Sequence, residues 1–418
     1  MKKIVCHFLL PICFIAASCS KDTPENDHDN GDLKEIINLG AEEKANCYIV
    51  QSPGIYQFEA DNQINLGEGL PVPPQINPES AALVWQTEKG LISSVELVLK
   101  EGTPYVVFEV EEARGNALIA VYNSRKEIEW SWHIWMPEEE ITSITSSSGY
   151  EVMNINLGAI NNTPGDAQSY GMLYQWGRKD PMPAAATLTG NTSTLGAPLY
   201  DIQGNSVTIS NSDWNSTQNN TIAYSIAHPT VCLSNYAQYA NSRDWLKENE
   251  SDDALWGNPQ GDQKTSENIY VNKGKKTCYD PSPAGWRVPP ADVFIHFTSS
   301  GGYAWTCNEF NVADVNNDGI INIADYNYGW HFMINDNTPS YFPAAARFDG
   351  SYAMLMGSVS GIWGNYWSNS PSSSMKGGAL SVLAFQVKDM NGNDMTTVSP
   401  SASASKADAY SIRCVRDN

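Results

Sequence analysis

One stretch of the sequence has the residue types and the spacing of a calcium-binding loop. In residues 314–325, side chains with oxygen donors occupy positions 1, 3, 5, 9 and 12, namely Asp314, Asn316, Asp318, Asn322 and Asp325. Gly319 at position 6 permits a sharp turn, and Ile320 at position 7 offers its backbone carbonyl. Because Ca²⁺ takes about six to eight such oxygen ligands, the spacing predicts a bound calcium ion. An acidic turn without metal is the alternative.

The predicted calcium ion is expected to be structural. The loop resembles a dockerin repeat, but a dockerin needs two repeats, and residues 389–393 lack both the glycine and the closing carboxylate. The tripeptides with which calcium-dependent lectins hold sugars, Glu-Pro-Asn and Gln-Pro-Asp, are absent from the sequence. We therefore expect calcium to staple the C-terminal domain rather than to bridge to a ligand.

Cysteine and histidine form no recognisable site. Five cysteines follow position 19, an odd number without zinc-ligand spacing: Cys47, Cys232, Cys278, Cys307 and Cys414. A disulfide between Cys278 and Cys414 is plausible in an oxidising compartment, and five buried thiols are the alternative. The histidines after residue 18 stand in no catalytic constellation, so the sequence predicts no enzymatic activity.

The elements before residue 137 are predicted to be strands. Short apolar runs separated by turn residues recur at residues 45–51, 56–60, 81–86, 91–100, 105–110, 116–122 and 128–135. Seven short strands at this spacing predict an immunoglobulin-like β-sandwich over residues 41–137. In the last run, Trp130 and Trp132 share the face expected to be core, with a sugar-binding platform as the alternative. His133 points the other way and is expected to face solvent.

The N-terminus has the composition of a signal peptide. Lys2 and Lys3 precede an apolar stretch that is too short to span a bilayer, and small residues lead from it to Cys19. This order resembles the bacterial lipobox, which implies removal of residues 1–18 and a lipid on the Cys19 thiol. A plain secretory signal is the alternative.

The next segment, residues 19–40, is predicted to be an acidic, flexible tether. Its first part is rich in Asp, Asn, Pro and Gly and has too few apolar residues to bury a core. Lys21 followed by Asp22 is similar to the surface-export signal of Bacteroidota lipoproteins. We therefore expect a lipid anchor in the outer membrane, with the rest of the chain displayed at the cell surface.

The charge of the chain limits its partners. The 418 residues carry a formal net charge of −22 at pH 7, which argues against nucleic acid or anionic lipid as a partner. The length allows two or three domains. Charged residues make up only 17% of the chain, beside 13 Trp and 20 Tyr, which suits an extracellular β-rich protein.

Two parts of the chain resemble known families. Residues 45–56, 115–120 and 130–135 together are similar to the N-terminal module of Bacteroidota surface lipoproteins and fimbrillin-related proteins. This resemblance implies a location at the envelope and no catalytic role.

A second resemblance covers residues 150–418. Five pieces in order are similar to the Fibrobacter succinogenes major paralogous domain: residues 153–159, 174–181, 279–289, 366–368 and 413–416. The resemblance implies a C-type-lectin-like α+β domain, related in shape to formylglycine-generating enzymes. Ser282 stands where family members often carry Cys, and Asn154 replaces a common Asp.

Several segments of this domain have local signals. The prolines near residue 285 indicate extended backbone, and residues 291–297 are expected to begin a short helix. Residues 178–180 (Arg-Lys-Asp) are expected to form an ion-paired loop, with ligand binding as the alternative. Residues 184–225, rich in Thr, Asn, Ser and Gly, are predicted to be a loop insertion of the kind that carries binding function.

The sequence therefore predicts a mainly β protein, with an immunoglobulin-like sandwich followed by a lectin-like α+β domain with long loops. Three functions remain open. The first is a non-catalytic binding module or adhesin for an extracellular glycan or protein. The second is a structural or assembly subunit associated with fimbriae. The third is an envelope enzyme related to formylglycine-generating enzymes, which no motif in the sequence supports.

Overall fold

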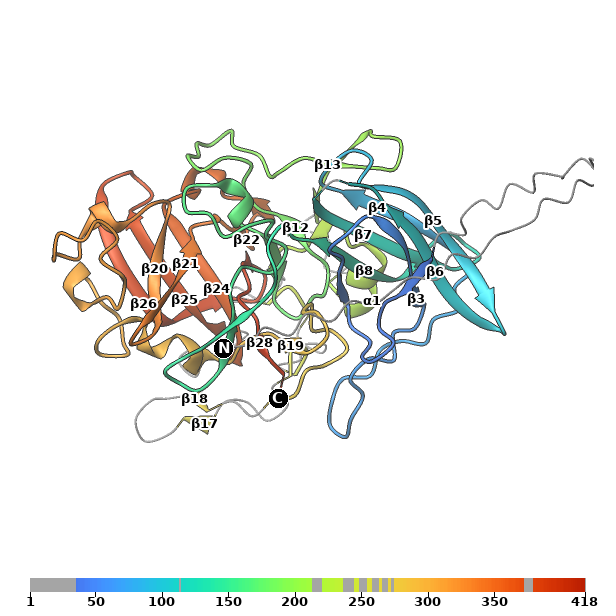
Figure 1. Ribbon diagram of the computed structural model, residues 1–418, viewed down its shortest axis with the longest axis horizontal. Coiled ribbons are helices and arrows are strands. Elements are labelled where there is room, and N and C mark those ends of the chain that lie inside the picture. The colour runs from blue at the N-terminus through green and yellow to red at the C-terminus, as the bar shows by residue number, and fades with distance from the viewer. Residues whose placement is uncertain are drawn as a thin grey trace, which may run out of the picture. The chain divides into compact units, whose positions relative to one another are not determined.

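Alternating apolar and polar residues fold into all seven strands that the sequence predicts before residue 137 (Figure 1). These strands are β2 (Cys47–Ile49), β3 (Gly54–Glu59), β4 (Ser80–Gln86), β5 (Ile92–Lys100), β6 (Thr103–Val110), β7 (Gly115–Tyr122) and β8 (Ile128–Met136). Taken together, the described residues are mainly β, as predicted.

The computed structural model describes residues 35–112, 114–212, 220–235, 244–247, 254–257, 263–264, 270–271, 274–371 and 379–417. Residues 35–418 form one compact unit. The predicted signal peptide, the lipidation residue Cys19 and most of the tether lie outside the described residues. Within the described ranges, every helix is too short or too polar to cross a bilayer. The domain division at residues 41–137 and 150–418 stays a prediction.

A short strand that the sequence did not predict precedes the seven. β1 (Ile36–Asn38) pairs in parallel with β3. The end of the predicted tether therefore belongs to a sheet, which corrects the expectation of flexibility up to residue 40. The reason lies in Ile36 and Ile37, because two adjacent β-branched residues favour extended backbone.

The first eight strands form two sheets with a shared core. One sheet has the order β1-β3-β6-β5, and the other joins β4, β7, β8 and β2. Aromatic rings meet between the sheets, where the ring centroids of Phe58 on β3 and Trp132 on β8 are 5.0 Å apart. Trp130 and Trp132 are fully buried. The interpretation of these tryptophans as core residues is confirmed.

The other face of β8 is buried as well, which overturns one expectation. His133 is only 1% exposed, because the C-terminal part of the chain packs against this face. Its imidazole lies 2.8 Å from Asn116 Oδ1 and 3.3 Å from the Tyr174 hydroxyl. The prediction of a solvated His133 was wrong because β8 is covered on both sides. Burial lowers the pKa of His133 to about 3.

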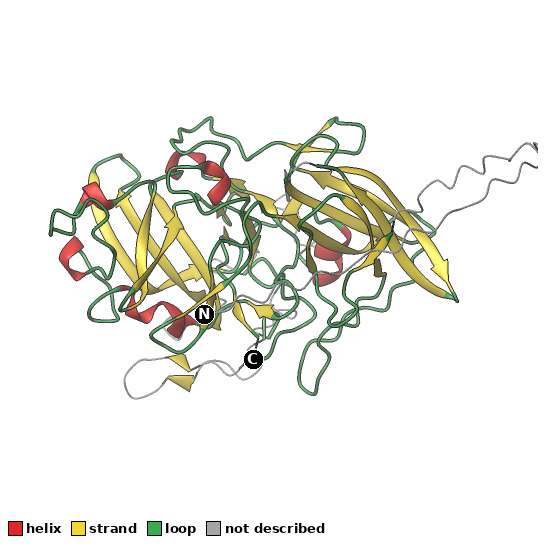
Figure 2. Ribbon diagram, viewed as in Figure 1, coloured by secondary structure: helices red, strands yellow, loops and turns green. Residues whose placement is uncertain are grey.

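Apart from β24, β25 and β26, most strands after residue 137 are short, and they belong to several sheets (Figure 2). They are β9 (Ser143–Thr145), β10 (Glu151–Met153), β11 (Met172–Gln175), β12 (Met182–Pro183), β13 (Leu199–Tyr200), β14 (Ser206–Val207), β15 (Ser210–Asn211), β16 (Val231–Cys232), β17 (Gln263–Lys264), β18 (Tyr270–Val271), β19 (Trp286–Arg287), β20 (Gly329–Asn335), β21 (Thr338–Pro343), β22 (Phe348–Asp349), β23 (Met354–Leu355), β24 (Trp363–Pro371), β25 (Ala379–Lys388), β26 (Asp394–Ser405), β27 (Ala409–Tyr410) and β28 (Val415–Arg416).

The described helices are all short. They are the α-helix α1 (Ile222–Ala227) and the 3₁₀ helices η1 (Ala167–Ser169), η4 (Ala291–Phe297), η5 (Cys307–Glu309), η6 (Ile323–Asp325) and η7 (Gly357–Val359). η4 occupies the residues at which a short helix was expected. Its side of the molecule has a second aromatic core, in which the rings of Phe297 and Phe332 stack with their centroids 4.4 Å apart.

The predicted insertion of residues 184–225 is partly built into the N-terminal sheet. β13 pairs with β14 and also with the edge of β4, where Tyr200 lies opposite Gln86. The sheet order β14-β13-β4-β7-β8-β2 thus combines strands that are far apart in the sequence. This segment is more than a surface loop.

Candidate functional site

The loop of residues 314–325 folds as a tight turn around its own acidic side chains. The Asp314 carboxylate accepts hydrogen bonds from the backbone N–H groups of Asp318 (3.2 Å) and Gly319 (2.7 Å). The buried Asp325 carboxylate accepts one from Val315 N–H (2.9 Å). Gly319 has φ +83°, the left-handed conformation for which a glycine was expected at this position.

The donor types of this loop fit calcium, but its carboxylates are not gathered. The Asn316 side-chain amide donates to Asp318 Oδ2 (3.1 Å), and that of Asn322 donates to the Ile320 carbonyl (2.9 Å). In the part of the chain that the structure describes, no three His, Cys, Asp or Glu side chains converge as metal ligands. Calcium at this loop stays a prediction, and its binding requires these oxygens to exchange hydrogen bonds for the ion.

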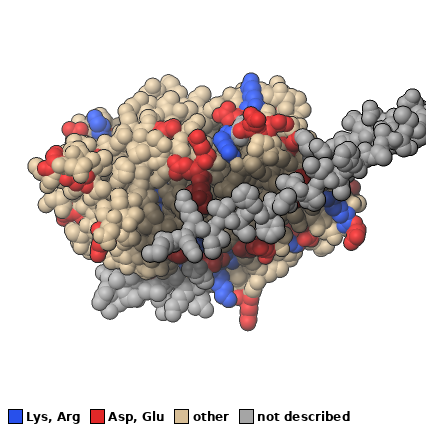
Figure 3. Space-filling model, in the orientation of Figure 1, with Lys and Arg blue, Asp and Glu red and all other residues tan. Residues whose placement is uncertain are grey.

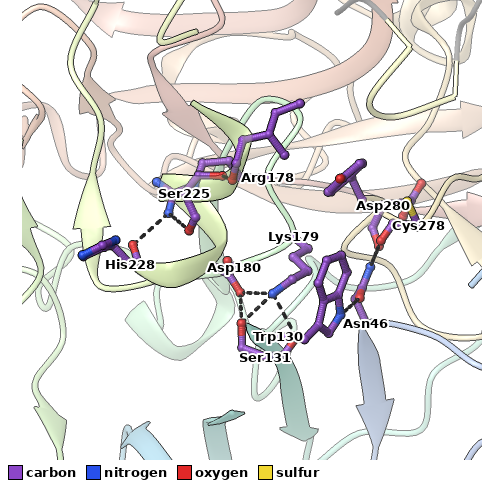
Figure 4. A network of polar contacts seen from close by, with 12 residues as sticks. Asn46, Trp130, Ser131, Arg178, Lys179, Asp180, Ser225, His228, Cys278 and Asp280 are labelled. Carbon is purple, nitrogen blue, oxygen red and sulfur yellow. Dashed lines mark hydrogen bonds and ion pairs between the residues drawn. The ribbon is translucent and has the colours of Figure 1, made fainter. Parts of the chain in front are cut away.

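The predicted ion-paired loop lies at the centre of a buried polar network (Figure 4). Lys179 Nζ donates to Asp180 Oδ1 (2.7 Å), to the Ser131 carbonyl (3.0 Å) and to the Ser131 hydroxyl, and it lies 4.7 Å from the centre of the Trp130 ring. Burial lowers the pKa of Lys179 although Asp180 opposes this shift. All three N–H donors of Lys179 are used, and Arg178 Nε, the network's donor without a partner, is buried.

The same network joins the two halves of the chain. Asn46, beside β2, donates from its side-chain amide to the carbonyls of Cys278 (2.7 Å) and Asp280 (2.9 Å), and Trp130 Nε1 donates to its Oδ1 (3.0 Å). The Arg178 side chain donates to the carbonyls of Ser225 and His228. These motif residues hold the fold together rather than line an accessible site.

The predicted Cys278–Cys414 disulfide is not present. All five described cysteines are free. The two thiols face different neighbours, since Cys278 Sγ lies 3.5 Å from the Pro71 carbonyl and Cys414 Sγ lies 3.3 Å from the Ser282 hydroxyl. Burial raises the pKa of both thiols to about 12, which makes them poor nucleophiles at neutral pH.

Arg413, in the last motif, is completely buried. Its guanidinium donates to Asn156 Oδ1 (2.9 Å), to the Ser340 hydroxyl (3.0 Å) and to the Tyr341 carbonyl (2.6 Å). Phe342 packs against it, with the guanidinium carbon 4.2 Å from the ring centre. A buried charge with this many partners has a structural role.

An accessible candidate site lies on the sheet of β24, β25 and β26, which run side by side in red and orange in Figure 1. The register places Trp363, Gln386 and Thr397 in one row across the sheet, and Asn365, Ala384 and Ser399 in the next. Phe385, between these rows, and Tyr366, beyond the second row, point into the core. A cleft of about 230 Å³ opens over the other face of the sheet.

Arg347, just before β22, and Tyr410, on β27, also line this cleft. The Arg347 guanidinium pairs with Asp349 (3.3 Å) and Asp408 (3.9 Å) and lies 5.3 Å from the centre of the Trp363 ring. Burial opposes its charge, but Tyr410, Asp408 and Asp349 together raise the pKa of Arg347. Burial also raises the pKa of Asp408. The cleft thus has a cluster of ion-paired side chains beside a half-buried indole ring.

Two hydrogen-bond donors of the cleft have no partner. Arg347 Nε and Asn365 Nδ2 are both buried and both lack an acceptor. Asn365 is 8% exposed and lines the floor of the cleft. Leaving such a donor unsatisfied costs about 1–3 kcal/mol, so each of these groups in a native protein requires an explanation. Because both atoms are buried, ligand oxygens in the cleft would provide one only if these side chains turn toward them.

No motif in the sequence indicates this cleft. Trp363, Asn365 and Arg347 belong to none of the patterns described above. A signal was nevertheless present, because Thr397 and Ser399 alternate with the buried Val398 as expected for a strand with one polar face. What the sequence did not contain is the pairing that brings these strands and Arg347 together.

No family model, curated protein or solved structure was found to match this chain.

Proposed function

We propose that this chain is a lipid-anchored envelope protein that acts without catalysis as a binding module or adhesin, and that it binds a glycan in the cleft on β24–β26. The observation that carries the proposal is the pair of unpartnered donors, Arg347 Nε and Asn365 Nδ2, beside the accessible ring of Trp363. Sugars present hydroxyl oxygens at their rim and C–H groups on their faces. An aromatic ring can stack on the C–H groups of a sugar, and N–H donors without a partner can bond to its hydroxyl oxygens.

The charge around the cleft favours this ligand class over a polyanion. Arg347 is countered by Asp349 and Asp408, so the cluster carries no surplus of positive charge. The face of the molecule drawn in Figure 3 is mostly uncharged, and its Lys and Arg side chains are scattered rather than gathered. A polyanion such as nucleic acid would find no basic patch on this face.

We also propose an immunoglobulin-like fold for the N-terminal part, a lectin-like fold for the C-terminal part, and a location at the outer membrane. The two facing sheets of β1–β8 support an immunoglobulin-like sandwich, and the buried motif residues such as Arg413 support a lectin-like C-terminal domain. The lipobox-like residues before Cys19 support an outer-membrane anchor. Calcium in residues 314–325 is proposed as a staple of the C-terminal domain, where Ile321 packs against the second core.

A glycan array tests the proposal. The full-length chain, kept soluble in a detergent without a sugar headgroup, is applied beside its Trp363→Ala and Tyr105→Ala variants. Tyr105, on β6, is a partly buried aromatic residue that does not line the cleft, and it serves as the matched control. We expect a specific glycan signal that Trp363→Ala loses and Tyr105→Ala keeps. A blank array from folded protein, or equal signals from both variants, would overturn the proposal.

A fimbria-associated assembly subunit is the second candidate, and one observation favours it. β5 lies at the end of its four-stranded sheet, so one side of this nine-residue strand has no partner among the described strands. An open edge of this kind can receive a strand from another chain. Co-purification with fimbrial subunits that survives Trp363→Ala would support this role, and purification without them would count against it.

A further inference from the structure

The cleft continues into a second aromatic surface. Tyr303 lines the cleft, and the centre of its ring lies 4.6 Å from that of Trp305. Trp305 is 64% exposed and Tyr303 is 46% exposed, although soluble proteins bury most of their large aromatic side chains. The Trp305 ring therefore extends the aromatic surface that Tyr303 contributes to the cleft.

The chain holds these exposed rings firmly in place. Ala304, between them, is fully buried and exchanges two backbone hydrogen bonds with Val398 on β26, of 2.9 Å and 3.1 Å. The next residues are fixed by a capping box, in which the Glu309 carboxylate accepts from the hydroxyl (2.8 Å) and the backbone (3.2 Å) of Thr306. The rings therefore stand on an anchored segment and lose little conformational freedom when a ligand binds.

The charged cluster beside the cleft selects against an acidic ligand. One guanidinium, from Arg347, faces two carboxylates, Asp349 and Asp408, and the Tyr410 hydroxyl already donates to Asp408 (2.7 Å). A ligand carboxylate would therefore meet more negative than positive charge, whereas a neutral hydroxyl can accept from Arg347 Nε without that repulsion.

We infer that the site binds a neutral oligosaccharide across two subsites, one sugar unit in the cleft at Trp363 and Asn365 and a further unit on the Tyr303–Trp305 pair. This inference rests on the proposed function and names its ligand class. It makes the chain length of the glycan, as well as the identity of one sugar, a determinant of affinity.

Titration calorimetry with a graded series of probes tests it. The full-length chain is titrated with malto-, manno- and xylo-oligosaccharides of one to six units, and with sialyllactose as the acidic comparison. In the series that binds, we expect affinity to rise about tenfold or more between one unit and three, and sialyllactose to bind more weakly than neutral trisaccharides.

Variants separate the two subsites. Trp305→Ala is expected to lower trisaccharide affinity about tenfold and to leave monosaccharide affinity within about twofold, and Trp305→Phe is expected to restore most of the loss. Trp363→Ala is expected to lower the affinity for both the monosaccharide and the trisaccharide. If binding is lost in Trp363→Ala but Trp305→Ala changes nothing, or affinity is independent of length, the second subsite is wrong while the proposed function stands. If sialyllactose binds best, the neutral ligand class is wrong. If no probe binds and the glycan array is also blank, the proposed function itself fails.

Discussion

Two regions of this molecule place a cation over a tryptophan ring beside an aspartate, and they differ in how completely the cation is satisfied. In the buried network, Lys179 lies 4.7 Å from the Trp130 ring centre and uses all three donors. In the cleft, Arg347 lies 5.3 Å from the Trp363 ring centre and keeps one donor without a partner. Residue type does not separate structural charge from binding charge, and neither does hydrogen-bond completeness alone, since the buried Arg178 Nε also lacks a partner; access to the surface does.

The largest expected loss of stability follows from a substitution in the buried network of Lys179 and Asp180. Asp180→Ala leaves Lys179 buried without its counter-charge, which is expected to lower the free energy of unfolding by about 3–5 kcal/mol. The matched change in the cleft, Asp349→Ala, removes a partly exposed partner and is expected to cost about 1 kcal/mol or less. Urea unfolding of both variants measures the difference. Equal losses would contradict the division into a structural network and a binding cleft.

In the loop of residues 314–325, the proposed ligand of the side-chain oxygens is a calcium ion rather than a sugar. If calcium binds, free calcium at about a hundred times its Kd raises the free energy of unfolding by about 2.7 kcal/mol. Asp318→Ala is expected to abolish that gain, and Asp389→Ala, in an acidic turn without ligand spacing, to keep it. Thermal unfolding with calcium and with chelator measures both. An identical midpoint under the two conditions would remove calcium from the account.

A smaller effect comes from pH. The folded pKa of His133 is about 3, below the value of about 6.5 expected in the unfolded chain. The unfolded state therefore binds more protons below pH 6.5, and the contribution of neutral His133 is fully present above that pH and is lost as the pH falls toward 3. Between pH 7.5 and pH 5 the loss is about 2 kcal/mol. His133→Gln is expected to flatten this slope in urea titrations. An unchanged slope would mean that other groups dominate acid unfolding.

The smallest expected change in stability distinguishes the amide in the cleft from an amide of the buried network. Asn365→Leu replaces an unpartnered buried amide by an apolar side chain of similar shape, and it is expected to leave stability unchanged or to raise it by about 1 kcal/mol. Asn46→Leu removes an amide whose oxygen and nitrogen are both bonded, and it is expected to destabilise the chain. Thermal unfolding of the two variants decides the point. A marked loss of stability in Asn365→Leu would show that this amide has a structural role.

Local patterns predicted the strands well and the site poorly. The apolar alternation of residues 128–135 was sufficient to predict β8 and the burial of Trp132, because both depend on the strand period alone. The exposure predicted for His133 failed because the residues that cover it, such as Tyr174, lie far along the chain. The cleft was missed for the same reason, since Arg347 precedes β22 of one sheet, Asn365 lies on β24 of another, and only the tertiary fold brings them together.

The most direct test of the central claim is a crystal structure of the chain with the tightest ligand from the glycan array. The account predicts a sugar ring over Trp363, with ligand oxygens about 3 Å from Arg347 Nε and Asn365 Nδ2. A ligand bound elsewhere on the molecule, with the cleft on β24–β26 free of sugar, would contradict it.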